Sequence, residues 1–270
     1  MRGFSLLALV PLLLAACGPS RHEVPASRAA VGVAEVSRAA YGFGVPQFPD
    51  ADPHDWSGRT PWHYPVHGID VSKWQGDIDW PTVRASGVSF AYLKATEGGD
   101  VIDDRFLDNW QRAAAAGLPR GAYHFYYFCR TAAEQAAWFT RHVPRDPGAL
   151  PAVLDMEWNH KSRTCPVRPA PEQIRAEMMV FLQLLTRHYG KRPMIYTTVD
   201  FYRDNQLWRV PGHNFWLRSV ADHPSGTYPG QPWALWQYTG TALVPGIAGH
   251  TDLNAFAGTR EQWLGFAYGG

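Results

Sequence analysis

Two carboxylates, Asp155 and Glu157, stand two residues apart in the segment PAVLDMEWN, residues 151–159. The segment is short and is apolar up to Leu154, which is typical of a buried strand. Side chains two residues apart on a strand point to the same face, with Cβ atoms about 6.5 to 7 Å apart. We therefore predict that both carboxylates project into one cavity.

Paired carboxylates of this kind have a definite chemistry. In a partly desolvated cleft the two groups repel, so one tends to keep its proton near neutral pH while the other stays ionised. This division suits glycoside hydrolysis, in which the protonated group gives its proton to the leaving oxygen. The ionised group supports positive charge on the sugar, directly or by holding a substrate group that attacks. The pair alone leaves a solvated strand end or a metal site open as alternatives.

Two further acids fall at the ends of other predicted strands. The segment HGIDVSKWQGDIDW, residues 67–80, places Asp70 at the end of the first strand. The segment HTDLNAF, residues 250–256, places Asp252 where a last strand would close a barrel beside the first. Acids at the ends of strands one, four and eight would face a common pocket. This coincidence favours an active site over isolated strand ends.

The elements that must position these acids are short apolar runs bounded by Gly, Pro or polar residues, which predict strands. The predicted strands are residues 66–72, 88–96, 121–128, 151–157, 193–198, 214–220, 233–239 and 250–256. Helical patterns span residues 103–117, 131–143 and 170–190, with a Thr131–Glu134 capping box in the second.

Strands that alternate with helices predict a parallel sheet, and about eight of them in one domain favour a closed barrel. The helical patterns thin out after residue 210. The fold class is therefore α/β, a distorted barrel whose last strands lack full crossover helices, in a single domain of residues 66–270.

The first residues, MRGFSLLALVPLLLAACGPS, predict an export signal, with a basic residue, an apolar stretch and small residues before Cys17. The apolar stretch is too short to span a bilayer as a mature helix. The run LAAC at 14–17 resembles the lipobox of bacterial lipoproteins. That resemblance implies a signal peptide of residues 1–16 and lipidation of the Cys17 thiol. Gly18, in place of an Asp, favours the periplasmic side of the outer membrane.

Residues 17–65 are rich in Pro, Ala, Ser and Gly and lack sustained periodicity. We expect this segment to be a lipidated tether that is partly ordered near its end. The two cysteines that remain, Cys129 and Cys165, lie beyond predicted strand ends in an oxidising compartment. They are expected to form one disulfide.

The composition limits the possible partners. A formal net charge of +1 and no long run of Lys or Arg argue against a nucleic-acid partner. Twelve Trp and twelve Tyr can serve either as core or as platforms for sugars. His54, His63 and His67 lack the spacing of a metal site, so no metal is expected.

Six separated motifs resemble, in order, landmarks of the glycoside hydrolase family 25 lysozymes, the Chalaropsis-type N-acetylmuramidases. The motifs are HGIDVSKWQGDIDW, FAYLKATEGG, GAYHFYYF, VLDMEWN, PMIYTT and LWQYTG followed by VPGIAGHTDLN, between about Val66 and Trp263. The resemblance implies a (β/α)5(β)3 barrel that cleaves the β-1,4 bond between N-acetylmuramic acid and N-acetylglucosamine in peptidoglycan. It implies no cofactor. The partners expected are peptidoglycan glycan strands, with the membrane touched only through the N-terminal lipid, and the protein is expected to be a monomer.

The resemblance also assigns roles to residues. Glu157 matches the general acid, and Asp155 matches the partner that stabilises the transition state or orients the substrate's N-acetyl group. Asp70 and Asp252 match supporting acids. The sugar-binding candidates are Tyr123, Tyr196, Trp216 and Gln237, although core packing with a satisfied hydrogen bond stays open for the two tyrosines and the glutamine.

One departure from the family pattern lies in FWLRSVADH, where Arg218 and Val220 occupy positions at which Ala and an aromatic residue are usual. It puts the sugar contacts on that side in question. Lys94 and Glu97 are expected to form an ion pair at a strand end.

Two other functions fit some of these features. A chitinase-like N-acetylhexosaminidase barrel would also use an Asp-x-Glu pair, but positions 150–153 lack its preceding Asp-x-x-Asp run. A non-catalytic peptidoglycan-binding lipoprotein would have no need for a proton donor.

Overall fold

The computed structural model describes Met1, residues 45–160 and residues 162–268. The predicted export signal, the lipidation site Cys17 and the larger part of the tether lie outside the described residues. No helix in the described part of the chain is long and apolar enough to cross a membrane.

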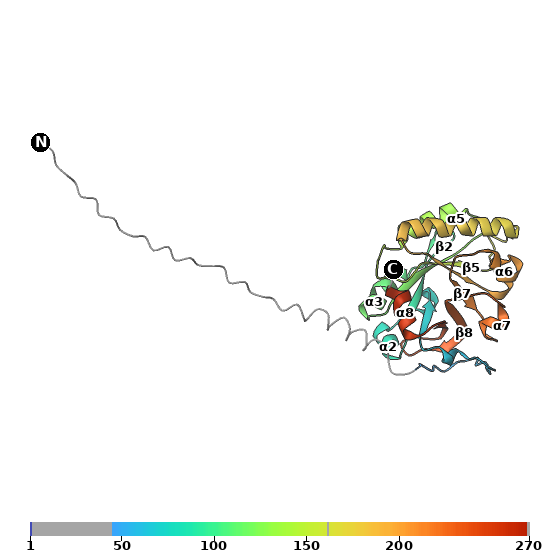
Figure 1. Cartoon of the computed structure of the whole chain (residues 1–270), viewed down its shortest axis with the longest axis horizontal. Coiled ribbons are helices and arrows are strands. Elements are labelled where there is room, and N and C mark those ends of the chain that lie inside the picture. The colour runs from blue at the N-terminus through green and yellow to red at the C-terminus, as the bar shows by residue number, and fades with distance from the viewer. Residues whose placement is uncertain (2–44, 161, 269–270) are drawn as a thin grey trace. The chain divides into compact units, whose positions relative to one another are not determined.

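Eight strands form a closed barrel (Figure 1). They are β1 (His67–Val71), β2 (Phe90–Glu97), β4 (Arg120–Phe125), β5 (Val153–Met156), β6 (Met194–Thr197), β7 (Phe215–Arg218), β8 (Leu235–Leu243) and β9 (His250–Phe256). The strands from β1 to β8 pair in parallel, whereas β9 is antiparallel to both β8 and β1 and closes the barrel between them. All eight predicted strands are confirmed.

One strand was not predicted. The two-residue strand β3 (Val101–Ile102) pairs antiparallel with the end of β2 and lies outside the closed ring. Both of its residues are exposed, and a strand of two residues is too short to show a hydrophobic alternation.

The helices flank the barrel. They are α2 (Trp80–Ala85), α3 (Phe106–Ala115), α4 (Ala132–His142), α5 (Pro171–Tyr189), α6 (Val199–Asp204), α7 (Pro224–Thr227) and α8 (Arg260–Tyr268). The three predicted helices correspond to α3, α4 and α5. The Thr131–Glu134 capping box at the start of α4 is present, and α5 ends at Gly190 with a φ of 73°.

The connections shorten toward the end of the chain, as the sequence predicts. The crossover from β5 to β6 contains the 19-residue helix α5, while α6 has six residues and α7 has four. No helix separates β8 from β9. The barrel is therefore fully α/β on one side and mainly β on the other.

The barrel interior is filled by apolar side chains from alternate positions on the strands. Phe90, Val153 and Met194, at the first positions of their strands, are fully buried there. Trp263 of α8 stacks on Phe90 with ring centroids 4.7 Å apart and closes this amino-terminal end of the parallel strands. The open end of the barrel is therefore the carboxyl-terminal end of the strands.

Residues 45–65, which we call the strap, lie against the barrel beside β8. The Ala51 amide donates to the Thr241 carbonyl at 3.0 Å, and the Leu243 amide donates to the Pro49 carbonyl at 2.8 Å. Trp56 packs edge-on against Trp236, with centroids 5.1 Å apart. The strap thus forms part of the same compact unit as the barrel.

A disulfide joins Cys129, after β4, to Cys165, in the long connection after β5. Both residues lie on loops that follow the carboxyl-terminal ends of neighbouring strands. The pairing expected from the sequence is present in the structure.

Candidate active site

Four acids line one cavity of about 300 Å³ at the carboxyl-terminal end of the strands. Asp155 and Glu157 come from β5 and the residue just beyond it, Asp70 from β1 and Asp252 from β9. Asp70 and Asp252 are direct cross-strand partners. The structure therefore brings together the four acids that the sequence predicted to share a pocket.

Strand parity explains the position of the pair on β5. Leu154, Met156 and Trp158 are buried in the core between the sheet and the helices, whereas Val153 points into the barrel. Asp155 and Glu157 follow the parity of Val153 and so face the cavity.

Asp70 is held by a buried network. Asn254 Nδ2 donates to Asp70 Oδ1 at 2.7 Å, and Gln237 Nε2 donates to both carboxylate oxygens at 3.1 and 3.2 Å. Tyr196 donates its hydroxyl proton to Gln237 Oε1 at 2.8 Å, and Trp216 Nε1 donates to Asn254 Oδ1 at 2.7 Å. Burial raises the pKa of Asp70 to about 6, against the opposing effect of the hydrogen bonds from Asn254 and Gln237.

This network changes the interpretation of three predicted sugar-binding residues. Tyr196, Trp216 and Gln237 line the cavity, but each is at least 93% buried. Each also directs its polar group to a protein partner. They position Asp70 and shape the cavity wall. Asn254, two residues after Asp252 on the same strand face, was missed, and strand parity was the signal that could have found it.

Tyr123 differs from these residues. It lines the cavity and is only partly buried, and its hydroxyl makes no hydrogen bond within the described part of the chain. Burial and the neighbouring carboxylates, Asp70 first among them, raise its pKa well above the ordinary value, so the hydroxyl keeps its proton. It remains a candidate donor to a bound sugar.

The pair on β5 is poised for proton chemistry. Burial, and then repulsion by Glu157, raise the pKa of Asp155 well above its usual range, and Asp155 Oδ1 is buried without a hydrogen-bond partner. Burial raises the pKa of Glu157 to about 7, against the attraction of Arg218 and Lys94. Burial and repulsion by Asp70 raise the pKa of Asp252 to about 8. Burial thus raises the pKa of both members of the pair.

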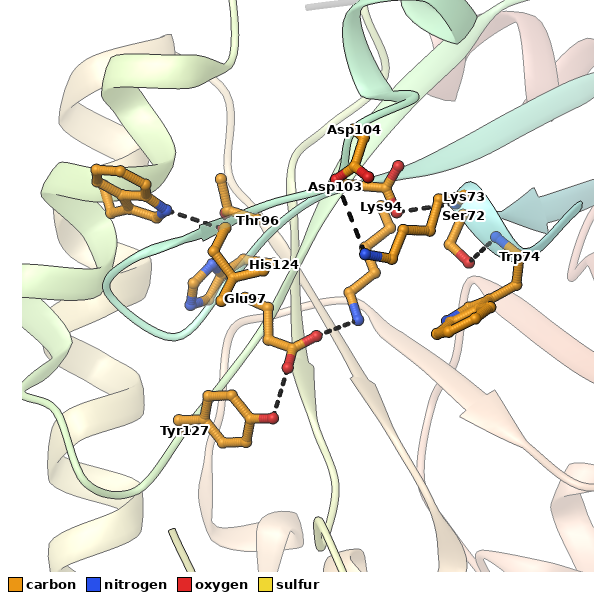
Figure 2. A network of polar contacts seen from close by, with 12 residues as sticks. Ser72, Lys73, Trp74, Lys94, Thr96, Glu97, Asp103, Asp104, His124 and Tyr127 are labelled. Carbon is orange, nitrogen blue, oxygen red and sulfur yellow. Dashed lines mark hydrogen bonds and ion pairs between the residues drawn. The ribbon is translucent and has the colours of Figure 1, made fainter. Parts of the chain in front are cut away.

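A second polar cluster borders the cavity at the end of β2 (Figure 2). Lys94 Nζ lies 2.6 Å from Glu97 Oε2, and the Tyr127 hydroxyl donates to Glu97 Oε1 at 2.5 Å. The predicted ion pair is confirmed. Because Glu97 is engaged on both oxygens, its contribution is to hold Lys94 beside the acids.

Two residues at the cavity mouth were not predicted to belong to the site. Trp74 follows β1, is 81% exposed and lines the cavity, so its ring is available to stack on a sugar. Arg218, at the end of β7, lines the same cavity, and no ion pair or hydrogen bond engages its guanidinium within the described residues. The sequence marked Arg218 only as a departure from the family pattern.

The histidines have structural contacts. His67 is buried and bonded to the Tyr238 hydroxyl at 2.9 Å and to the Tyr64 carbonyl at 2.8 Å. His63 bonds to Thr60, and His54 packs on Trp56. Among the residues that the structure describes, no group of three or more His, Cys, Asp or Glu side chains is arranged to hold a metal ion.

A carboxylate cluster at the open end of such a barrel is the arrangement that glycoside hydrolysis requires, and glycoside hydrolases are the class that the site fits. The particular family follows from residues 69–247, which match the family described as glycosyl hydrolases family 25, and the chain belongs to that family.

Known proteins agree with this assignment. Lysozyme M1 of Streptomyces globisporus is 35% identical over 97% of this chain and 89% of its own length. The uncharacterized protein YegX of Escherichia coli O6:H1 is 36% identical over 78% of this chain and 76% of its own. The structure of a family 25 glycosyl hydrolase from Bacillus anthracis superposes with a TM-score of 0.73 at 33% identity, covering 81% of this chain and 99% of that one.

Proposed function

We propose that this protein is an exported muramidase that hydrolyses the β-1,4 bond between N-acetylmuramic acid and N-acetylglucosamine in peptidoglycan. The observation that carries the proposal is the convergence of Asp70, Asp155, Glu157 and Asp252 on one cavity at the open end of the barrel. Membership of family 25 and the similarity to Lysozyme M1 support the same activity. The reaction uses side-chain carboxyl groups and needs no cofactor.

Glu157 is proposed as the general acid. With a pKa of about 7 it holds its proton in mildly acidic solution, and it is the less buried member of the pair. It gives this proton to the glycosidic oxygen as the bond to the sugar breaks. Lys94 and Arg218 stabilise the carboxylate that remains.

Asp155 is proposed to bind the N-acetyl group of the sugar whose bond is cleaved. Its side chain lines the cavity and accepts no hydrogen bond within the described residues, so an amide N–H of the substrate can donate to the carboxylate. A donor to a carboxylate favours the ionised form and lowers its pKa. Substrate would in this way produce the unequal protonation that burial alone does not, with Asp155 ionised and Glu157 protonated.

Asp70 and Asp252 are proposed to support the developing positive charge. Both lie opposite the pair across the cavity mouth, and the Gln237 and Asn254 amides fix Asp70 in place. Near neutral pH Asp70 is ionised, and its attraction for the sugar would strengthen as the sugar gains oxocarbenium character, while Asp252 remains largely protonated beside it.

The test is release of reducing ends from purified cell wall by the wild type and by Glu157→Gln. The variant is expected to lose about 10²- to 10⁴-fold in kcat because it cannot donate the proton. Glu172→Gln, an exposed acid at the start of α5, is the matched control and should keep full activity.

Undiminished release by Glu157→Gln would refute the assignment of the acid. A wild type that binds wall tightly without releasing reducing ends would instead identify a binding lipoprotein. A wild type that cleaves chitin in preference to wall would identify an N-acetylhexosaminidase.

We propose further that Cys17 is lipidated and that the enzyme acts as a monomer on the periplasmic side of the outer membrane, with residues 17–65 before the catalytic domain of residues 66–270. The LAAC run supports the anchor. Cys17→Ala should move the protein from the membrane fraction to the soluble fraction of the periplasm. Unchanged fractionation of that variant would contradict the anchor.

A further inference from the structure

A groove of about 550 Å³ lies between the strap and β8, beside the catalytic cavity. Arg218 and Asp252 line both spaces, so the groove adjoins the cavity. One wall is formed by the strap, including Asp52, Trp56 and Trp62, and the other by residues 238–241 of β8. The strap precedes residues 69–247, the part of the chain that matches the family.

The wall is held firmly in place. Besides the backbone bonds between strap and β8, Asp50 Oδ1 accepts a hydrogen bond from the Thr241 hydroxyl at 2.5 Å. Trp56 is partly buried against the core, and Phe48 packs on the same cluster. A preformed groove of this size falls in the range of sites that bind small molecules or peptide segments.

Charge is distributed unevenly along the groove. At the end shared with the catalytic cavity lie Asp252 and the guanidinium of Arg218, which makes no ion pair or hydrogen bond within the described residues. Asp50 and Asp52 line the groove but not the cavity. Burial opposes ionisation of Asp50, but hydrogen bonds from Thr239 and Thr241 outweigh it and lower its pKa, and Asp52 is exposed without an ion pair in the described residues.

The glycan carries a substituent with the complementary order of charges. In peptidoglycan the lactyl group of N-acetylmuramic acid bears a short peptide, with a carboxylate close to the sugar and an amino group on the diamino residue farther out. N-acetylglucosamine carries no charge, and N-acetylmuramic acid without its peptide carries only the lactyl carboxylate, so a further sugar would leave Asp52 without a cationic partner. Complementary charge at both ends therefore favours the peptide over a longer glycan.

We infer that the groove between the strap and β8 binds the peptide stem of the substrate, with Arg218 pairing with its carboxylate and Asp52 with its amino group. The inference rests on the proposed muramidase function and adds that the enzyme selects peptide-bearing strands. The guanidinium suits this position because it binds carboxylates through two parallel hydrogen bonds.

The test compares three substrates made from one wall preparation: peptide-bearing strands, the same strands with the free amino groups acetylated, and strands stripped of peptide by an amidase. The kcat/KM for release of reducing ends is measured for the wild type, Asp52→Asn and Asp55→Asn. Asp55 lies on the strap and is exposed but does not line the groove, so it is the matched control.

The wild type and Asp55→Asn should prefer peptide-bearing strands over stripped strands by about tenfold or more, and acetylation should reduce the preference about fivefold. Asp52→Asn should show a preference that is reduced about fivefold and no longer responds to acetylation. This cycle isolates the contact between Asp52 and the amino group from any general loss of stability.

A second arm tests the other end of the groove. Arg218→Gln at pH 5, where Glu157 holds its proton in either protein, should no longer distinguish strands with a free peptide carboxylate from strands in which that carboxylate is amidated. The wild type should favour the free carboxylate about tenfold.

The outcomes separate this inference from the proposed function. Cleavage of all three substrates at equal rates, with ratios that Asp52→Asn leaves unchanged, would overturn the groove assignment while muramidase activity stands. A wild-type preference for longer stripped strands, weakened by Asp52→Asn, would show that the groove takes sugars and would also overturn it. Failure to release reducing ends from any of the three would refute the proposed function itself.

Discussion

At the scale of single residues, the pKa values of the cavity carboxyl groups determine which of them can donate a proton. Four carboxyl groups have pKa values raised by burial, and two cations, Lys94 and Arg218, lower that of Glu157. Lys94 is fixed by Glu97, whereas Arg218 has no such restraint. The pKa of Glu157 therefore lies near neutrality, because burial raises it and the two cations lower it. A change in either effect should be visible in the pH profile of activity.

The rate should fall as pH rises through about 7, because Glu157 then loses the proton that it donates. Above that pH, kcat/KM on cell wall is expected to decrease about tenfold per pH unit. Arg218→Gln removes a positive charge that favours the carboxylate, so the pKa of Glu157 should rise and the descending limb should move to higher pH. A limb that stays in place, or moves to lower pH, would contradict the proposed influence of Arg218.

At the scale of elements, the positions of the acids depend on how closely the strands approach. Gly68 on β1 pairs with Phe90 on β2, and a Cβ atom at Gly68 would overlap the Phe90 ring. Phe90 in turn stacks on Trp263 of α8. The lack of a side chain at Gly68 therefore allows β1 to lie against the filled barrel, with Asp70 two residues further along at the open end.

Gly68→Ala should destabilise the protein by about 1 to 3 kcal/mol, because the added methyl group must displace buried rings. Urea unfolding measures the free energy. The control is Gly265→Ala in α8, where nothing lies within 4 Å of the added Cβ, and a gain of about 0.5 to 1 kcal/mol is expected from the lower flexibility of the unfolded chain. Equal effects of the two substitutions would contradict the close packing at β1.

At the scale of the whole molecule, the buried ionisable groups make stability depend on pH in two opposite ways. The acids of the cavity have raised pKa values, so they bind protons more tightly in the folded state, and their contribution is lost as pH rises through about 6 to 8. Burial lowers the pKa of His67 and of His124 to about 4. Their contribution is instead lost as pH falls from about 6.5 toward 4.

The four cavity acids outweigh the two buried histidines, so stability should fall as pH rises from about 5 to 8. Between pH 6.5 and 8.5 the histidines no longer contribute a slope, and deprotonation of Glu157 and Asp252 should lower Tm by roughly 5 to 10 °C. Calorimetry at several pH values measures the change. Asp252→Asn should flatten the slope in this interval. A Tm that rises from pH 6.5 to 8.5 would show that the acids are not buried together.

The strands, the main helices and the placement of the paired acids could be predicted from local sequence. Strand parity in PAVLDMEWN placed Asp155 and Glu157 on one face, because side chains alternate along any strand whatever surrounds it. Short apolar runs, the Thr131 cap and Gly190 gave the strands and the main helices, since these signals act within a few residues. The loss of helical pattern after residue 210 predicted the weak crossovers between the last strands.

Other features were decided only by the tertiary structure, because they depend on contacts between distant parts of the chain. Gln237 and Trp216 carry polar groups suited to sugars, yet Asp70 and Asn254, more than 15 residues away in sequence, engage them. The strap, which looks like a tether in composition, gains its order from β8. In the sequence, Arg218 is only a departure from the family pattern, whereas in the structure its charge lies between the catalytic acids and the strap groove. The physical reason is that the sequence specifies neighbours along a strand but not which side chains meet across a barrel.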